Sequence, residues 1–219
     1  MILSSIINII SPPKCLVCNK EGKVMCSECW QNTTALRKSA CFLCNKLNDD
    51  GKTCSNCRRK SYLLGATIPY RLQDIVKESI YQLKYYSNVD MAKFLAEQIA
   101  DFVPQIHFDC ICFVPSTGKT QRKRGYNQSK LIAKQVSKVL HIPISQKLIR
   151  NSHVDQIGLD RQQRFAVVAD NFILQRACTN QNILLIDDVI TTGATVNECT
   201  KVLKNAGAKK VWVLAVAKK

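Results

Sequence analysis

The chain has 219 residues, which is longer than one typical domain but too short for two large ones. Its hydrophobic fraction of 46% is enough for a packed core, and its formal net charge of +16 is strongly basic. Eight thiolates around two zinc ions would lower that charge to roughly +12. A balance this basic indicates polyanionic partners, such as nucleic acid, phosphorylated metabolites or an anionic lipid surface.

The chain begins with an apolar run over residues 1–10 that has no cation ahead of it, so no secretory signal is predicted. The run is about half the length that a membrane span needs. We expect a short helix docked on the body of the protein, with contact to a membrane as the alternative. Together with the cysteine pattern below, this predicts a reducing cytoplasm, or a peripheral position at the inner face of the membrane.

Eight of the twelve cysteines lie in C-x-x-C pairs near the N-terminus, a spacing that suits metal binding better than a disulfide scaffold. They are Cys15, Cys18, Cys26, Cys29, Cys41, Cys44, Cys54 and Cys57. Tetrahedral zinc takes four soft ligands, so two zinc ions are predicted, in closed sites with a structural role. Neighbouring pairs could share an ion or alternate pairs could interleave. The remaining cysteines are predicted to be buried apolar residues: Cys110, Cys112, Cys178 and Cys199.

After Arg58-Arg59-Lys60 the texture of the sequence changes, and we predict a cysteine-rich module over 1–61 and a second domain over 62–219. From Gly65 on, short apolar runs alternate with segments of helical period, which predicts an α/β fold with a parallel sheet flanked by helices. The predicted strands are Ala66–Tyr70, Cys110–Val114, Ile144–Ile149, Ile183–Ile186 and Lys210–Ala215. The predicted helices are Leu72–Tyr85, Asp90–Phe102, Asn127–Leu140 and Thr195–Asn205.

The segment between Asp109 and Asp155 contains nine cations and no acidic residue, whereas a solvated surface usually mixes signs. The cations are Lys119, Arg122, Lys123, Arg124, Lys130, Lys134, Lys138, Lys147 and Arg150. This is more positive charge than one pyrophosphate requires, and it favours a single-stranded nucleic acid. The predicted contacts are Arg122, Lys123, Arg124, Tyr126 and Lys130, with Tyr85 and Tyr86 as further stacking candidates.

The most informative segment runs from Ile183 to Thr195 and reads ILLIDDVITTGAT. Its aliphatic start predicts a buried parallel strand, and Asp187 and Asp188 follow at the end where open α/β sheets bind ligands. The small residues of the turn let backbone N–H groups approach an anion at a helix N-terminus. The turn residues are Thr191, Thr192, Gly193, Ala194 and Thr195. A ribose 5-phosphate suits both features, with its phosphate in the turn and its hydroxyls on the acids.

This segment resembles the signature of type I phosphoribosyltransferases. The resemblance implies a five-stranded parallel sheet that binds phosphoribosyl pyrophosphate with Mg²⁺. The run from Val114 to Lys119 resembles that family's pyrophosphate loop, which implies ligand contacts from Ser116, Thr117 and Lys119. In an active enzyme, Lys84, Lys119 and Arg124 would stabilise departing pyrophosphate while the two acids hold the ribose.

Further segments resemble the ComF family of competence-associated proteins. They are Leu83-Lys84-Tyr85, Arg124–Gln128, and Gln156–Arg164 followed by Phe172, together with the cysteine module. The resemblance implies natural transformation, single-stranded DNA, and competence or recombination proteins as partners. An active phosphoribosyltransferase is the alternative, and a zinc-bearing interaction module is a third hypothesis. The chain stops at Lys219 directly after the last predicted strand, without the base-gripping hood of salvage enzymes, so the competence role is ranked first.

Overall fold

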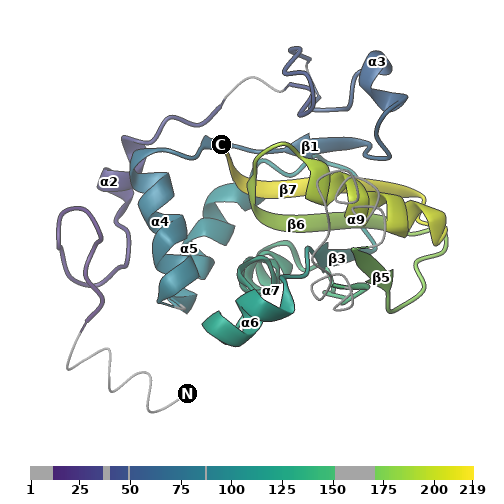
Figure 1. Cartoon of the computed structure of the whole chain (residues 1–219). Helices are drawn as coiled ribbons and strands as arrows, with labels where there is room; N and C mark the ends of the chain where they lie inside the picture. The colour runs from purple at the N-terminus through teal and green to yellow at the C-terminus, as the bar shows by residue number, and fades with distance from the viewer. Residues whose placement is uncertain (1–11, 37–39, 49, 87, 151–170) are drawn as a thin grey trace, which may run out of the picture.

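The computed structural model describes residues 12–36, 40–48, 50–86, 88–150 and 171–219. A parallel sheet forms its centre, in the strand order β1-β7-β6-β3, with β2 added on β7 (Figure 1). Every pairing in this sheet is parallel. The strands are β1 Gly65–Thr67, β2 Tyr70–Arg71, β3 Cys110–Phe113, β6 Asn182–Ile190 and β7 Lys210–Lys218. The five-stranded parallel sheet expected from the resemblance is therefore confirmed.

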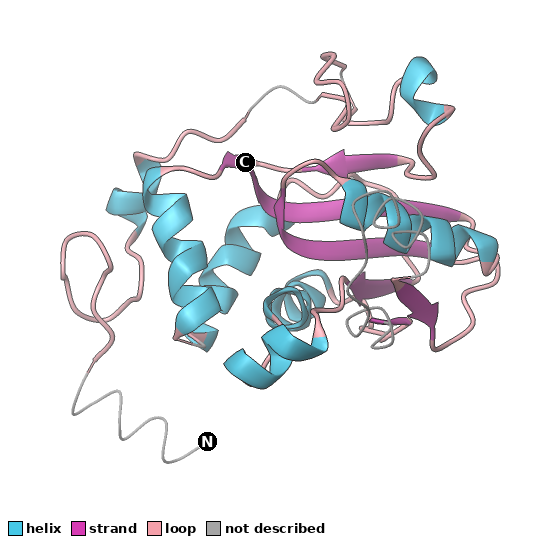
Figure 2. Cartoon of the chain, viewed as in Figure 1, coloured by secondary structure: helices cyan, strands magenta, loops and turns pink. Residues whose placement is uncertain are grey.

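Helices lie on both faces of the sheet, as Figure 2 shows. They are α4 Asp74–Tyr85, α5 Val89–Ala100, α6 Gly118–Arg124, α7 Gln128–Leu140 and α9 Ala194–Asn205. Asparagine or threonine side chains cap three of them: Asn88 accepts from Met91 N, Thr117 from Thr120 N and Asn127 from Lys130 N. Each cap satisfies one N–H that the helix itself leaves unpaired.

Two apolar cores lie on opposite faces of the sheet, because successive side chains of a strand alternate between faces. Leu184 and Ile186 of β6 join the core under α4, α5 and α7. Ile183 and Leu185 of the same strand join the core under α9. All four side chains are fully buried, which explains why this strand reads as a continuous aliphatic run.

The cysteine-rich region forms two ribbons that dock at different places on this body. The first contains α2 Ser27–Gln31 and packs on the α4 and α5 side, where Trp30 makes edge contacts with Tyr70 and Phe94. The second contains α3 Ser55–Arg58 and lies beside β1 (Figure 1). Its Phe42 and Leu63 belong to the core under α9. The boundary between residues 61 and 62 stays a prediction.

Three predicted strands differ in the structure. The run 66–70 divides into β1 and β2, because Pro69 has no N–H to donate to a ladder. The run 144–149 makes one parallel bridge through Ile144, and its end forms β4 Leu148–Arg150, paired antiparallel with β5 Phe172–Leu174. The strand before the turn is longer than expected, since β6 continues to Ile190. No described helix is long and apolar enough to cross a membrane.

Candidate functional site

Each cysteine ribbon brings four sulfur atoms together. Within each set the Sγ atoms lie within 4.8 Å of one another, and the sets are Cys15, Cys18, Cys26, Cys29 and Cys41, Cys44, Cys54, Cys57. Neighbouring pairs therefore share a site, which decides between the two pairings left open by the spacing. The Sγ atoms of Cys15 and Cys26 are 3.7 Å apart, and those of Cys44 and Cys54 are 3.6 Å apart. A tetrahedral zinc ion with bonds of about 2.3 Å holds sulfurs about 3.8 Å apart, so both sets fit zinc.

The thiols of each set cannot all ionise without a cation. In the first ribbon, contact with the Cys26 sulfur, followed by burial, raises the pKa of Cys29 to about 12. Burial also opposes ionisation of Cys15, but backbone N–H groups of Cys18 and Cys26 outweigh it and lower its pKa to about 6. In the second ribbon the pKa of Cys57 is likewise raised to about 12 and that of Cys41 is lowered to about 6. A dication would supply the missing charge and keep all four sulfurs as thiolates.

The other four cysteines are buried. Burial raises the pKa of Cys112 to about 11, so this thiol is neutral at ordinary pH. The prediction that Cys110, Cys112, Cys178 and Cys199 are core residues is confirmed.

Asp187 lies within β6 and points inward. Its side chain is 8% exposed, and its Oδ1 accepts hydrogen bonds from Ser129 Oγ at 2.9 Å and from Asp188 N at 2.9 Å. Burial, reinforced by the Asp188 carboxylate, raises the pKa of Asp187 to about 8. The sequence places the two acids after the strand, but both belong to it, since Asp187 pairs with Ala215 of β7.

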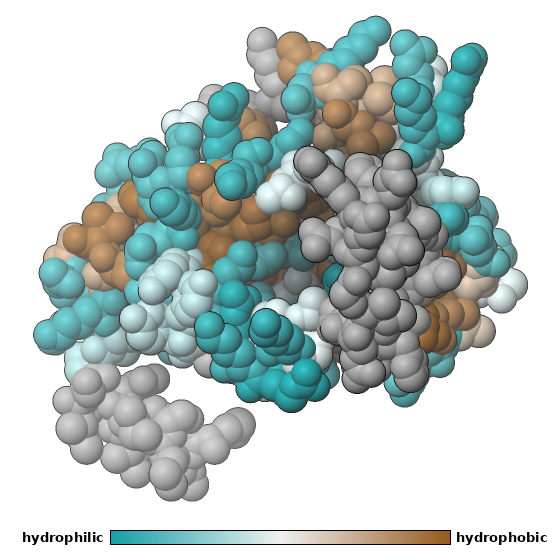
Figure 3. Space-filling model, viewed as in Figure 1, coloured by the Kyte–Doolittle hydropathy of each residue, from teal (hydrophilic) through white to brown (hydrophobic). Residues whose placement is uncertain are grey.

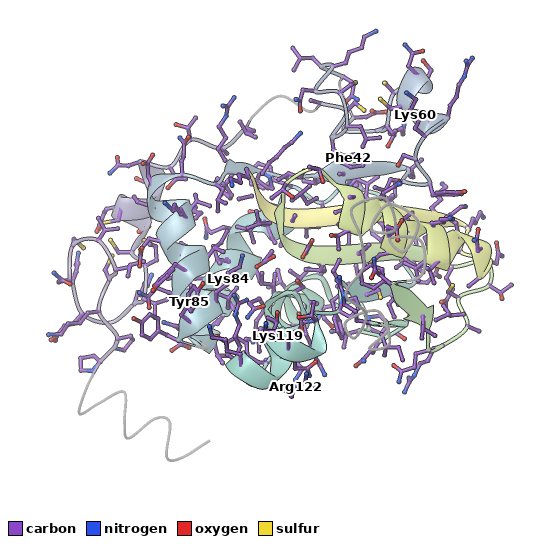
Figure 4. The ribbon with its side chains drawn as sticks, viewed as in Figure 1. Phe42, Lys60, Lys84, Tyr85, Lys119 and Arg122 are labelled. Carbon is purple, nitrogen blue, oxygen red and sulfur yellow. The ribbon has the colours of Figure 1, made fainter. Side chains whose placement is uncertain are left out.

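Asp188 forms an ion pair with Lys84. Lys84 Nζ at the end of α4 is 3.1 Å from Asp188 Oδ2, and both side chains are largely buried. The pair joins two residues that the sequence assigns to one site. A ligand hydroxyl or a metal ion that binds Asp188 would therefore also lie close to the Lys84 ammonium group. In Figure 4, Lys84 and Tyr85 of α4 lie beside α6, which carries Lys119 and Arg122.

The turn after β6 consists mainly of exposed residues around one glycine. Thr191, Thr192, Ala194 and Thr195 are exposed, and Gly193 adopts a left-handed φ of +81° that a side chain would disfavour. Gly193 occupies the N-cap position of α9, where no side chain accepts a hydrogen bond. The first N–H of α9, that of Ala194, donates instead to Thr192 Oγ1 of the turn at 3.4 Å.

The loop after β3 leaves the sheet beside the acids, because Val114 N donates to Ile186 O at 3.0 Å. Among the described residues, Ser116 Oγ in this loop is buried without a hydrogen-bond partner, and so is Gln128 Nε2 at the start of α7. Buried polar atoms normally have partners, so these two atoms fit a site that a polar ligand completes. Thr117 is already engaged as the cap of α6, where its hydroxyl donates to Thr120 Oγ1. Lys119 is exposed in the first turn of α6.

The predicted nucleic-acid residues separate into exposed and packed ones. Arg122 and Lys123 are exposed, and Arg124 lies 5.2 Å above the ring of Tyr85. Tyr126 is half-buried, and its hydroxyl donates to Leu83 O at 2.8 Å. This bond connects the segment between α6 and α7 to the end of α4. Lys130 Nζ lies 5.7 Å from the centroid of the Phe113 ring.

Lys147 departs from the predicted basic surface, because it is 3% exposed and its Nζ donates to Ala177 O. Arg150 also has a local contact, since it stacks over Phe172. The segment Gln156–Arg164, which carries part of the family resemblance, lies outside the described residues.

Sequence reasoning missed three contributors to this region. Ser129 holds Asp187, Tyr81 extends the exposed aromatic group on α4, and Phe42 contacts Gly193 from the second ribbon. Tyr81 could have been found from its spacing of four residues from Tyr85 on a predicted helix. Phe42 and Ser129 carry no local signal, because their roles depend on tertiary contacts.

Comparison with known proteins matches both parts of the chain. Residues 6–62 match the double zinc ribbon domain family and residues 127–219 match the phosphoribosyl transferase domain family. The chain is 28% identical to competence protein F of Haemophilus influenzae over 179 residues, 75% of this chain and 78% of that protein. It is 23% identical to competence protein ComFC of Bacillus subtilis over 198 residues, 86% of this chain and 81% of that protein. It is 30% identical to the DNA utilization protein YhgH of Escherichia coli over 110 residues, 48% of each chain.

The parallel sheet, the acid pair before a glycine-containing turn and the two four-cysteine sites define a phosphoribosyltransferase-like protein with a double zinc ribbon. Relatives of the same kind match across most of the chain. Over most of its length the chain is therefore similar to the ComF/ComFC competence proteins.

Proposed function

We propose that this protein handles single-stranded DNA that enters the cell during natural transformation, and that it binds phosphoribosyl pyrophosphate or a related phosphate with Mg²⁺. Two relatives are named competence proteins and a third is named a DNA utilization protein, which supports a role with DNA. Such a protein would act in the cytoplasm, near the inner face of the membrane where the strand arrives. Competence and recombination proteins would be its protein partners.

The observation that carries the DNA proposal is an exposed aromatic group beside a basic helix. Tyr81, Tyr85 and Tyr86 are 45%, 54% and 64% exposed. The rings of Tyr81 and Tyr85 are 4.4 Å apart at 38°, and Arg124 of α6 lies over Tyr85. Neighbouring exposed rings form an apolar patch of the kind that marks a contact surface, and a base has a face that stacks on tyrosine.

The neighbouring helix α6 supplies charge of one sign. Its exposed cations are Lys119, Arg122 and Lys123, and it has no acidic residue. Figure 3 shows hydrophilic side chains gathered over this part of the surface. Cations that track a phosphate backbone next to stacking rings are the usual arrangement of a non-specific single-strand groove. We name Tyr81, Tyr85, Tyr86 and α6 together the tyrosine platform.

The test measures binding of a fluorescent oligothymidylate by anisotropy at several salt concentrations. Tyr85→Ala should weaken binding by about 5- to 100-fold, which corresponds to about 1–3 kcal/mol for one stacked base. Arg122→Ala should weaken it and reduce the slope of log K against log salt by about 0.7, the loss of one phosphate contact. Tyr62→Ala is the matched control, because Tyr62 is 47% exposed but lies directly after the second ribbon rather than on α4. Equal losses for Tyr62→Ala and Tyr85→Ala, or a salt-independent affinity, would reject the platform.

The phosphate half of the proposal is supported by the exposed turn residues that lead into the N-terminus of α9 and by the two buried polar atoms at Ser116 and Gln128. Thr191 to Thr195 would hold the 5-phosphate, and Ser116 and Lys119 would contact pyrophosphate. Asp187 and Asp188 would hold the ribose hydroxyls or face Mg²⁺, which would neutralise the phosphate charge. Asp188→Asn should lower the calorimetric affinity for phosphoribosyl pyrophosphate in Mg²⁺. Unchanged binding would refute this role of the carboxylate.

A transferase activity is the second candidate, favoured by the position of Lys84. The Lys84 ammonium group lies 3.1 Å from Asp188. It could turn toward a departing pyrophosphate and stabilise its negative charge, while the Asp188 carboxylate accepts hydrogen bonds from the ribose hydroxyls. Lys119 and Arg124 would assist. Incubation of labelled phosphoribosyl pyrophosphate with a panel of bases and DNA distinguishes the two roles. Release of pyrophosphate with one acceptor favours the enzyme, and retention without release favours a binding protein.

A further inference from the structure

The second zinc ribbon contacts the strand, the turn and the helix that make up the phosphate site. Phe42 packs against Gly193 of the turn. Lys218 of β7, which pairs in register with Ile190 at the end of β6, donates from Nζ to Phe42 O at 2.9 Å and to Asn45 Oδ1 at 2.6 Å. Ser61, where the chain leaves the ribbon, donates to Asn197 Oδ1 in the first turns of α9 at 2.8 Å.

The contact between Phe42 and Gly193 leaves no room for a side chain on the turn. A Cβ atom at position 193 would lie 2.7 Å from Phe42 Cε2 and 3.3 Å from Cδ2. Phe42 is 5% exposed, so its ring is enclosed by the turn and the core under α9. A glycine can adopt many backbone conformations besides the left-handed one. A ring packed against Gly193 excludes some of these conformations.

The position of Phe42 is in turn set by the metal ligands on either side of it. The run Cys41-Phe42-Leu43-Cys44 is the first C-x-x-C turn of the second site, and its backbone closes through Cys41 N to Lys46 O at 2.9 Å and Asn45 N to Cys41 O at 2.8 Å. A zinc ion bound to Cys41 and Cys44 would fix the turn that presents the ring. The Lys218 contacts hold the same turn from the sheet.

The first ribbon has the same turn but a different neighbour. Leu16 of Cys15-Leu16-Val17-Cys18 corresponds to Phe42, and it packs with the core under α4, α5 and α7. Among the contacts of the described residues, none joins the first ribbon to the turn at Thr191–Thr195. The two zinc sites therefore have the same ligands but pack against different parts of the protein.

We propose that Phe42 is a positioning residue of the phosphate turn, and that the second zinc ribbon, unlike the first, holds this turn in the shape that binds the sugar phosphate. The inference deepens the phosphate half of the proposed function and rests on it for the identity of the ligand. Its structural half, the ordering of the turn by the ribbon, is independent of any ligand.

The experiment compares Phe42→Ala with Leu16→Ala in the full-length, zinc-loaded chain, and Phe42→Leu serves as the conservative variant. Hydrogen exchange of the amides of residues 191–196 should quicken in Phe42→Ala and stay at the wild-type rate in Leu16→Ala. If the turn without its ring keeps the binding shape about a tenth of the time, the affinity for phosphoribosyl pyrophosphate in Mg²⁺ falls about tenfold. Phe42→Leu should recover part of both effects. Zinc content is measured for each variant, and Phe42→Leu replaces Phe42→Ala if the latter loses metal.

Two results would overturn the inference. One is wild-type exchange of residues 191–196 in a zinc-loaded Phe42 variant, and the other is an equal effect of Leu16→Ala on those amides. Absence of phosphoribosyl pyrophosphate binding in the wild type would instead reject the proposed ligand, and the exchange measurement would still decide whether the ribbon orders the turn.

Discussion

Replacing Asp187 with asparagine tests the most unusual electrostatic feature of the site. The carboxyl is 8% exposed, and its Oδ1 accepts hydrogen bonds from Ser129 and from the backbone of Asp188. An asparagine oxygen can accept both of these bonds, so the variant removes the negative charge with little other change. The difference between the two proteins should then report the cost of burying that charge.

The sign of the pH dependence follows from the direction of the pKa shift. Burial raises the pKa of Asp187 in the folded protein to about 8, whereas an aspartate in an unfolded chain has a pKa near 3.9. The unfolded chain therefore releases this proton first, and the wild-type free energy of unfolding falls as the pH rises from about 4 to about 8. Between pH 6 and pH 8 the loss is about 2 kcal/mol. For a chain of this size that equals about 4–8 °C in melting temperature.

The assay is thermal unfolding at pH 6, 7 and 8 with zinc content checked at each pH. The wild type should lose about 4–8 °C more than Asp187→Asn over this interval, since other titrating groups are common to both. Asp101→Asn, at the exposed end of α5, should keep the wild-type dependence. Parallel curves for the wild type and Asp187→Asn would mean that Asp187 is ionised in the folded protein, and the reasoning from burial would fail.

Two further predictions concern the metal sites and the ion pair. Elemental analysis should find about two zinc ions per chain, and Cys44→Ser should leave about one, because four thiolates are needed for a closed site; less than one zinc in the wild type would reject the assignment. Lys84→Met should weaken calorimetric binding of inorganic pyrophosphate by about tenfold, the equivalent of one charge-assisted hydrogen bond, whereas Met at the exposed Lys93 of α5 should have no effect. Equal affinities for the two lysine variants would remove Lys84 from the site.

The parts of this fold that could be predicted from the sequence are those with a strong local signal. The spacing of the eight cysteines predicted two metal sites, although their pairing came only from the structure. The run Ile183–Ile186 is too apolar and too short to be anything but a buried strand. The helices α4, α5, α7 and α9 were predicted with small errors at their ends. The capping residue Asn127 explains why α7 begins one position later than expected.

The parts that were missed depend on contacts between distant residues. The helix α6 consists of seven polar residues and has no apolar stripe, so its pattern resembles a loop. On α7 the apolar Val139 is 40% exposed, while the polar residues Gln128 and Ser129 are buried. Ser129 is buried because it bonds Asp187, which lies 58 positions away in the chain. No pattern within a single element contains that information.

The docking of the two ribbons shows why a count of zinc sites says little about their roles. Both ribbons have the same ligand set and the same C-x-x-C turns, so their folding energetics should be alike. They differ in the residue after the first cysteine, which is Leu16 in one and Phe42 in the other. Leu16 packs with the core under α4, α5 and α7, whereas Phe42 reaches the glycine of the phosphate turn. If a metal site only stabilises the fold, its loss should weaken ligand binding only as far as it lowers the folded fraction of the protein. Loss of the second metal should therefore affect the turn before it affects the sheet, and loss of the first should do the reverse.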